Sequence, residues 1–159
     1  MDKPLTRQFS LSVQYASTSE NLPARAQFRR WIKIAMRRDA TLTLRLVDEP
    51  EGRELNKKYR GKNYATNVLT FDYHTGEGIC GDVVICAPVV EKEAALQHKN
   101  LLAHYAHLAI HAALHLQGYD HQNDDAAAEM EAIEIGLMLK LRHPDPYQII
   151  KTKNGRTRK

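Results

Sequence analysis

The sequence has few of the features that mark secreted, membrane-spanning or disulfide-bonded proteins. No apolar run approaches the ~20 residues that a membrane-spanning helix requires. Residues 1–10 are polar and lack the apolar centre of a signal peptide, so we expect a cytoplasmic protein. The only two cysteines, Cys80 and Cys86, flank a strand-like stretch that would hold their Cα atoms about 20 Å apart. Because a disulfide tolerates only roughly 7 Å between Cα atoms, we expect both thiols to be reduced.

Acidic residues are absent from the C-terminal segment 151–159, which carries five of the basic residues. The formal net charge of +4 therefore comes from this tail, and the rest of the chain is near neutral, with basic clusters at 25–38 and 53–62. A polar, basic tail is typically disordered, and it either adds non-specific affinity for nucleic acid or only increases solubility. A chain of 159 residues fits one domain, at 1–148, followed by a disordered tail at 149–159.

Hydrophobic spacing predicts the order of strands and helices. Strand-like patterns occur at 8–15, 41–47, 68–73 and 82–86. Helical patterns occur at 22–38, 51–59, 89–116 with an interruption near 98–100, and 124–141. This order, without repeats or a linker, predicts an α+β fold in which a small mixed sheet of about four strands packs with helices.

Three histidines near the end of the long helix have the spacing of a metal site. His111 and His115 are four residues apart, which places both imidazoles on one helix face. Gly118 then allows a sharp turn, after which His121 can return as a third ligand. Three neutral imidazoles leave one coordination position open, as in catalytic zinc sites. The spacing therefore predicts one zinc ion at the end of a central helix, although nitrogen ligands also suit copper, nickel or iron.

The other histidines have weaker claims to this ion. His104 would lie about 10.5 Å along the helix axis from His111, too far away to share a metal. His107 is four residues from His111, but only the downstream pair has the glycine and the returning histidine. We therefore expect His107 to pack or to support a ligand. The remaining histidines have no such neighbours and are expected at the surface: His74, His98 and His143.

The same histidine spacing, with its glycine, occurs in zinc peptidases of the metzincin type. Those peptidases carry a glutamate, their general base, directly after the first histidine, where this chain has Ala112. The metal ligands of such a peptidase are present without its base, which argues against peptidase chemistry.

A second candidate site lies at 56–63, where a predicted helix ends at Gly61 among cations. Arg60 is the residue of interest, because a guanidinium is always charged and can bind two phosphate oxygens at once. The neighbouring basic side chains are candidate RNA contacts: Lys57, Lys58 and Lys62. On spacing alone, a solvated helix end whose cations favour the helix dipole explains the same pattern.

Four segments carry a resemblance that covers most of the chain: Tyr59–Lys62, Thr66–Phe71, Gly81–Ile85 and His111–His121. Together they resemble the YbeY family of bacterial metal-dependent endoribonucleases, which act on single-stranded RNA in rRNA maturation and ribosome quality control. The resemblance extends from about Leu44 to Tyr147 and is most specific in the histidine segment.

The resemblance implies that His111, His115 and His121 bind zinc, and that Arg60 is the functionally important arginine near the metal. It also implies single-stranded rRNA as substrate, including the 3′ end of 16S rRNA, and the ribosome or its small subunit as partner. The chain departs from the family pattern at three positions, with Ala112 for a common Gly, Thr70 for a usual Ser and Asp72 for a frequent Pro. These changes leave the metal ligands intact and affect the loop beside the site.

We therefore expect a zinc-dependent endoribonuclease that hydrolyses a phosphodiester in rRNA. The metal would act as a Lewis acid or activate a water molecule, and Arg60 would hold the scissile phosphate. Asp120 is a candidate general base, and the residues identify no stronger one. Two alternatives stay open. One is a zinc peptidase, and the other is a non-catalytic ribosome assembly factor whose structural zinc is closed by a fourth ligand such as Asp120.

Overall fold

The computed structural model describes residues 8–73, 78–147, 150–151 and 157–158, in which two sheets and five helices are formed. The elements in chain order are β1 (Phe9–Ala16), α1 (Arg25–Ala35), β2 (Ala40–Val47), α2 (Glu49–Arg60), β3 (Val68–Asp72), β4 (Ile79–Cys86), α3 (Ala87–Leu96), α4 (Leu101–Leu116), α5 (Asp124–Lys140), β5 (Ile150–Lys151) and β6 (Thr157–Arg158).

The main sheet has four strands in the order β1-β2-β4-β3. Strands β1, β2 and β4 are parallel, whereas β3 pairs with β4 in the antiparallel direction and forms one edge of the sheet. The α+β class and the mixed four-stranded sheet predicted from the sequence are thus confirmed. Strand β4 begins three residues earlier than predicted, because Ile79 is buried in the sheet.

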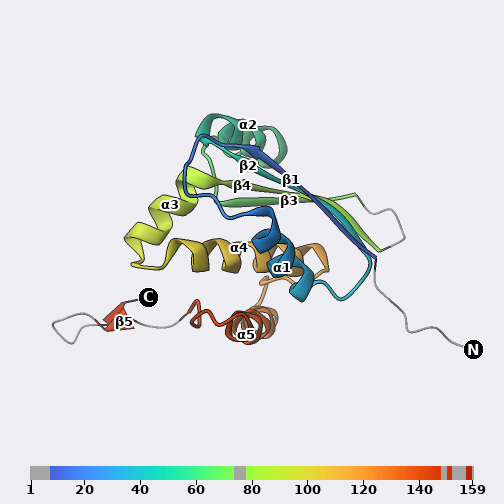
Figure 1. Cartoon of the computed structure of the whole chain (residues 1–159), viewed down its shortest axis with the longest axis vertical. Helices are drawn as coiled ribbons and strands as arrows, with labels where there is room; N and C mark the ends of the chain where they lie inside the picture. Colours follow the sequence, from blue (N-terminus) through green and yellow to red (C-terminus); the bar gives the residue numbers. More distant parts are fainter. Residues whose placement is uncertain (1–7, 74–77, 148–149, 152–156, 159) are drawn as a thin grey trace, which may run out of the picture.

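Helices cover both faces of this sheet, as Figure 1 shows, with α2 on one face and α1 and α4 on the other. The larger apolar cluster lies between the sheet and the α1 and α4 helices, and it includes Leu44, Val83, Phe28 and Ile110. A smaller cluster around Val47, Leu69, Val84 and Cys86 lies against Leu55 of α2. Buried residues alternate with more exposed ones along most of β2, whereas β4 ends in four consecutive buried residues, 83–86.

Helix α4 is the central helix of the fold and is buried along most of its length. It is separate from α3, because the predicted interruption is a full break at 97–100. His98 has a φ of 53°, and the Asn100 side chain accepts a hydrogen bond from the Ala103 backbone N–H at 3.0 Å, which caps the new helix. Because of this break, α4 runs in a different direction from α3 and lies along the sheet (Figure 1).

Several smaller predictions can be checked directly. Cys80 and Cys86 are free thiols, and no helix in the described ranges is long and apolar enough to cross a membrane. His98 is exposed as predicted, and His74 lies outside the described residues. His143 is only partly exposed, because its ring packs edge-on against Trp31 with the ring centroids 6.4 Å apart. Most of the predicted tail 149–159 lies outside the described residues, so its disorder stays a prediction.

Candidate functional site

The three predicted histidine ligands gather where α4 ends. His111 and His115 lie one turn apart on this helix, and the chain reverses direction just after it at Gly118, whose φ is 99°. Only glycine adopts this backbone region without strain, so Gly118 permits the turn that the histidine spacing required. The turn returns His121 to the helix, with its ring centroid 5.8 Å from that of His111.

His115 connects these histidines to the second candidate site. Burial lowers the pKa of His115, the nearby His111 and Arg60 lower it further, and Asp120 opposes them. Its electrostatic neighbours therefore include residues from α2 as well as from α4 and the turn. The lowered pKa favours the neutral imidazole, which is the form that binds metals. The buried Nδ1 of His115 has no hydrogen-bond partner among the residues that the structure describes.

Arg60 is the last residue of α2, and the helix ends because Gly61 adopts a left-handed conformation with a φ of 70°. The Arg60 Nη2 donates a hydrogen bond of 3.3 Å to the backbone carbonyl of Thr70 on β3, which holds the exposed guanidinium beside the sheet edge. The three lysines of this segment are also exposed: Lys57, Lys58 and Lys62. Of this cationic segment, Arg60 is the residue whose charge acts on one of the histidines, His115.

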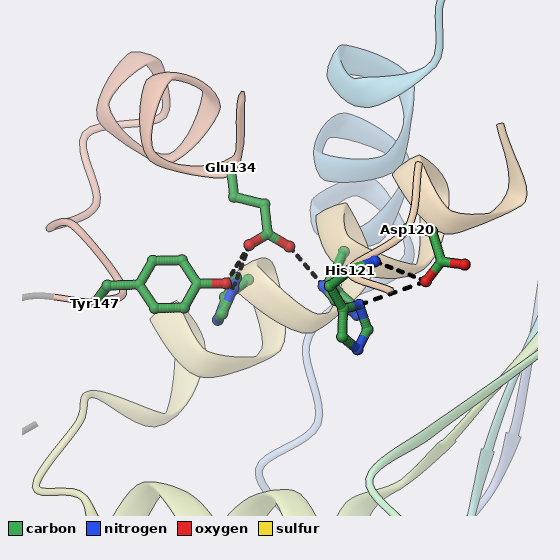
Figure 2. A network of polar contacts seen from close by, with 6 residues as sticks. Asp120, His121, Glu134 and Tyr147 are labelled. Atoms are coloured by element: carbon green, nitrogen blue, oxygen red, sulfur yellow. Dashed lines mark hydrogen bonds and ion pairs between the residues drawn. The ribbon is translucent and has the colours of Figure 1, made fainter. Parts of the chain in front are cut away.

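Glu134 is the site residue that the sequence analysis missed. It lies on α5 with 0% of its surface exposed, although it carries a carboxylate. Its Oε2 accepts a hydrogen bond of 2.6 Å from His111 Nδ1, and its Oε1 lies 3.3 Å from His107 Nε2. The Tyr147 hydroxyl donates to the same Oε1 from beyond the end of α5, so that Glu134 and Tyr147 point toward one another in Figure 2.

These contacts keep Glu134 ionised in spite of its burial. Burial alone would raise the pKa of the carboxyl, but the hydrogen bonds from His107, His111 and Tyr147 outweigh it and lower the pKa to about 2. A buried carboxylate with three donors is a rigid anchor, because removing any donor leaves charge without compensation. Its bond to His111 Nδ1 leaves the Nε2 of that ring free to bind a ligand.

The remaining histidines of α4 lie where their spacing predicted. His107 shares the Glu134 carboxylate with His111, and the two rings lie edge-on with centroids 6.3 Å apart, so His107 lies beside His111 on the side away from the turn. His104 is separate from the site, and its Nε2 lies 3.0 Å from Glu93 Oε1.

The three imidazoles lie near one another, but they are not arranged around a common metal position. Within the described ranges, no group of three or more His, Cys, Asp or Glu side chains has the geometry to hold a metal. The His121 side chain is 60% exposed, and its Nδ1 lies 3.9 Å from the Asp120 carboxylate, which also accepts from the His121 backbone N–H (Figure 2). A cavity of about 280 Å³ opens beside His111, His121 and Glu134. His111 and the exposed His121 both line this cavity, and imidazole nitrogens are ligands that suit a transition metal.

The sequence profile described as Endoribonuclease YbeY matches residues 12–142 of the chain. The chain belongs to the YbeY endoribonuclease family. A relative named endoribonuclease YbeY from Methylobacillus flagellatus is 51% identical, with 92% of this chain and 98% of the relative aligned. A relative of the same name from Paraburkholderia phytofirmans is 53% identical, with 91% of this chain and 95% of the relative aligned.

A solution structure from Thermotoga maritima shares the fold of this chain. It aligns with a TM-score of 0.53 at 24% identity and covers 87% of this chain and 99% of that chain. The YbeY match contains Arg60, the three histidines and Glu134, but ends before Tyr147. The buried carboxylate therefore lies within the matched span of the family, whereas its tyrosine partner lies beyond it.

Proposed function

We propose that the protein is a zinc-dependent endoribonuclease that cleaves single-stranded regions of rRNA in the cytoplasm. Its substrates would include the 3′ end of 16S rRNA, and it would act with the small ribosomal subunit in rRNA maturation and ribosome quality control. One observation carries the proposal. His111 and His115 lie one turn apart on α4, and the centroid of the His121 ring lies 5.8 Å from that of His111. Arg60, held at the sheet edge by the carbonyl of Thr70, is one of the charges that lower the pKa of His115. A phosphate-binding cation beside three imidazoles is what metal-assisted phosphodiester hydrolysis requires, and the relatives are named endoribonucleases.

His111, His115 and His121 are the residues that would hold the metal. A bound zinc ion would supply a Lewis acid for the phosphodiester. Two features of the site favour binding of such an ion. The Nδ1 of His111 is bonded to Glu134, which leaves the Nε2 of that ring free, and His121 is exposed on a loop beside the helix. Asp120 lies against His121, which makes it a group that can orient this imidazole or accept a proton near it.

Glu134 is proposed as the positioning residue of this site. A carboxylate that accepts from a ligand's second nitrogen fixes the tautomer and orientation of the ring and raises its basicity. The Glu134 side chain is itself fixed by His107 and Tyr147, so the orientation of His111 is set by a buried network rather than by the exposed surface.

Glu134→Gln is expected to lower the affinity for zinc by roughly 10- to 100-fold, because the amide cannot provide the negative charge that orients His111. Titration of metal-free protein with zinc against a chromophoric chelator measures this without any activity assay. Glu129→Gln is the matched control, since Glu129 is an exposed carboxylate on the same helix. Wild-type zinc affinity in a folded Glu134→Gln protein would contradict the positioning role.

Arg60 would bind the non-bridging oxygens of the scissile phosphate. Its guanidinium is held in place by the carbonyl of Thr70, so part of the ordering is complete before substrate arrives. The exposed cations Lys57, Lys58 and Lys62 are proposed to contact neighbouring phosphates, which places the RNA backbone without reading its sequence.

The form of the substrate provides the test of this function. A phosphate must come close to the histidines at the end of α4, and a flexible strand bends toward such a site more easily than a duplex does. We expect the pure protein to cleave single-stranded RNA in a chelator-sensitive manner, to cleave the matched duplex weakly or not at all, and to leave casein intact. Low activity on free RNA is consistent with positioning by a ribosomal partner. Chelator-insensitive cleavage, or equal cleavage of duplex, would overturn the proposal.

The two alternatives give different results in the same experiment. A peptidase would degrade casein, although Ala112 is buried and provides no general base. A non-catalytic assembly factor would bind zinc and cleave neither substrate, even on small ribosomal subunits.

A further inference from the structure

Exposed aromatic rings gather beside the cationic end of α2. Among the described residues, three tyrosines are more than half exposed: Tyr59 at 54%, Tyr64 at 54% and Tyr73 at 55%. Tyr59 directly precedes Arg60, and Tyr73 directly follows β3, the strand whose carbonyl holds the Arg60 guanidinium. Large aromatic side chains are strongly driven from water, so rings left exposed beside a candidate active site call for an explanation.

Two of these tyrosines belong to one surface. The Tyr59 ring packs edge-on against Phe71 of β3, with ring centroids 5.1 Å apart. Phe71 and Tyr73 are two residues apart, which in an extended chain places both side chains on the same face. The hydroxyl of Tyr73 donates a hydrogen bond to the Asp82 carboxylate. Tyr59 is one of the neighbouring groups that raise the pKa of Tyr73. The aromatic surface therefore consists of Tyr59, Phe71 and Tyr73, on the edge strand and the adjoining helix end.

Cations adjoin this aromatic surface on its helical side. The Nζ of Lys58 lies 5.2 Å from the centre of the Tyr59 ring, and Arg60 follows immediately. Tyr64 is different: it lies beside a cavity near the start of α2, with Glu49, Pro50 and Arg53. Equal exposure in two different surroundings makes Tyr64 a natural comparison for Tyr59.

We propose that Tyr59 and Tyr73, supported by Phe71, form a base-stacking subsite that receives nucleotides of a single-stranded RNA next to the scissile phosphate. This inference rests on the proposed function and explains its strand preference. Bases of a single strand can stack on protein rings, whereas bases of a duplex are already stacked and paired within the helix. Aromatic rings alternating with cations are the usual surface for single strands, because rings take the bases and cations take the phosphates.

The alternative occupant, a partner protein, fits this surface less well. The fully buried centre of a protein interface is depleted in charge, whereas here Lys58 and Arg60 adjoin Tyr59 and Asp82 binds Tyr73. The rings lie at the β3 edge on the α2 face of the sheet, and Arg60, which follows Tyr59 and donates to the carbonyl of Thr70, provides a phosphate-binding cation at the same edge.

Stacking and phosphate contact respond differently to salt, and this difference tests the inference. We would measure binding of a labelled single-stranded RNA of about twelve nucleotides, and of its duplex, by fluorescence anisotropy with chelator present so that nothing is cleaved. Tyr59→Ala and Tyr73→Ala should each weaken single-strand binding about tenfold, with the slope of log K against log salt unchanged. Lys58→Gln should instead reduce that slope by about 0.7.

Matched variants control for charge, folding and the hydroxyl group. Tyr59→Phe and Tyr73→Phe keep the rings and should bind like the wild type, and Tyr64→Ala should also do so. Duplex binding should be equal in all the tyrosine variants, and melting temperatures identify any variant that is not folded. Wild-type affinity in both alanine variants, the same loss in Tyr64→Ala, or failure of the phenylalanines to restore binding would overturn the subsite.

The outcome is separable from that of the proposed function. Loss of binding in the tyrosine variants, without any cleavage by the wild type of free RNA or of RNA on small ribosomal subunits, would overturn the nuclease and keep the stacking of single strands. Chelator-sensitive cleavage together with unchanged binding in these variants would do the reverse.

Discussion

His115→Ala is expected to abolish the cleavage of single-stranded RNA and to remove most of the zinc that the wild-type protein retains. His115 lies on the last turn of α4 between His111 and the turn that returns His121, so the other two imidazoles cannot replace it. Metal assistance is worth several kcal/mol of transition-state stabilisation, so its loss should lower the rate by on the order of a thousandfold or more. Elemental analysis should find about one zinc per wild-type chain.

The control for His115→Ala is a histidine replacement outside the site. His98 is exposed and has a left-handed backbone, so His98→Asn suits its conformation and should keep both zinc and activity. Equal cleavage by His115→Ala and the wild type would assign the activity to a contaminant. Full zinc occupancy in a His111→Ala/His115→Ala variant would show that the metal binds elsewhere.

The fold could be predicted from the sequence because each element has a strong local pattern. The alternation in β1 and the stripe of Phe28, Trp31 and Ile32 in α1 are each set by which side chains are buried. The histidine segment was equally local, since one helix, one glycine and one returning residue define it. Patterns that lie within about ten residues can be seen in a sequence without knowledge of the tertiary structure.

Glu134 could not be assigned in this way, although one signal was present. Met130 and Met138, four residues before and after it, are both buried, so Glu134 lies on the apolar face of α5. A carboxylate on a buried face must be paired. Its partners, His107 and His111, come from α4, and only the packing of the two helices brings them together. The aromatic surface was missed for the same reason, because Tyr59 and Phe71 meet only where α2 adjoins the sheet edge.

Arg60 shows how far a resemblance can extend a sequence argument. From spacing alone, a solvated helix end explained its cation as well as a phosphate contact did. The structure places its charge near His115, 55 positions along the chain, because β3 lies between α2 and α4 and offers the carbonyl of Thr70. That placement makes the role of the guanidinium testable separately from the role of the metal ligands.

Arg60→Ala is expected to lower the rate of RNA cleavage by on the order of a hundredfold, equivalent to ~3 kcal/mol of transition-state stabilisation. Zinc content and melting temperature should be nearly unchanged, because the side chain is exposed and makes a single long hydrogen bond to Thr70. Arg60→Lys should restore activity only in part, since an ammonium group keeps the charge but cannot make the planar, two-point contact with a phosphate.

Arg53→Ala is the matched control, because Arg53 is also an exposed arginine of α2, its Nε donates a hydrogen bond to Asn63, and it is not among the charges that act on His115. Both alanine variants lose one positive charge from the same helix, so a general weakening of RNA attraction would affect them equally. A large loss in Arg60→Ala with a small loss in Arg53→Ala therefore identifies a specific contact of Arg60, and a fall in kcat with little change in KM assigns that contact to the transition state. Activity in Arg60→Ala equal to that of the wild type would refute the assignment, and equal losses in both variants would reduce Arg60 to one of several non-specific cations.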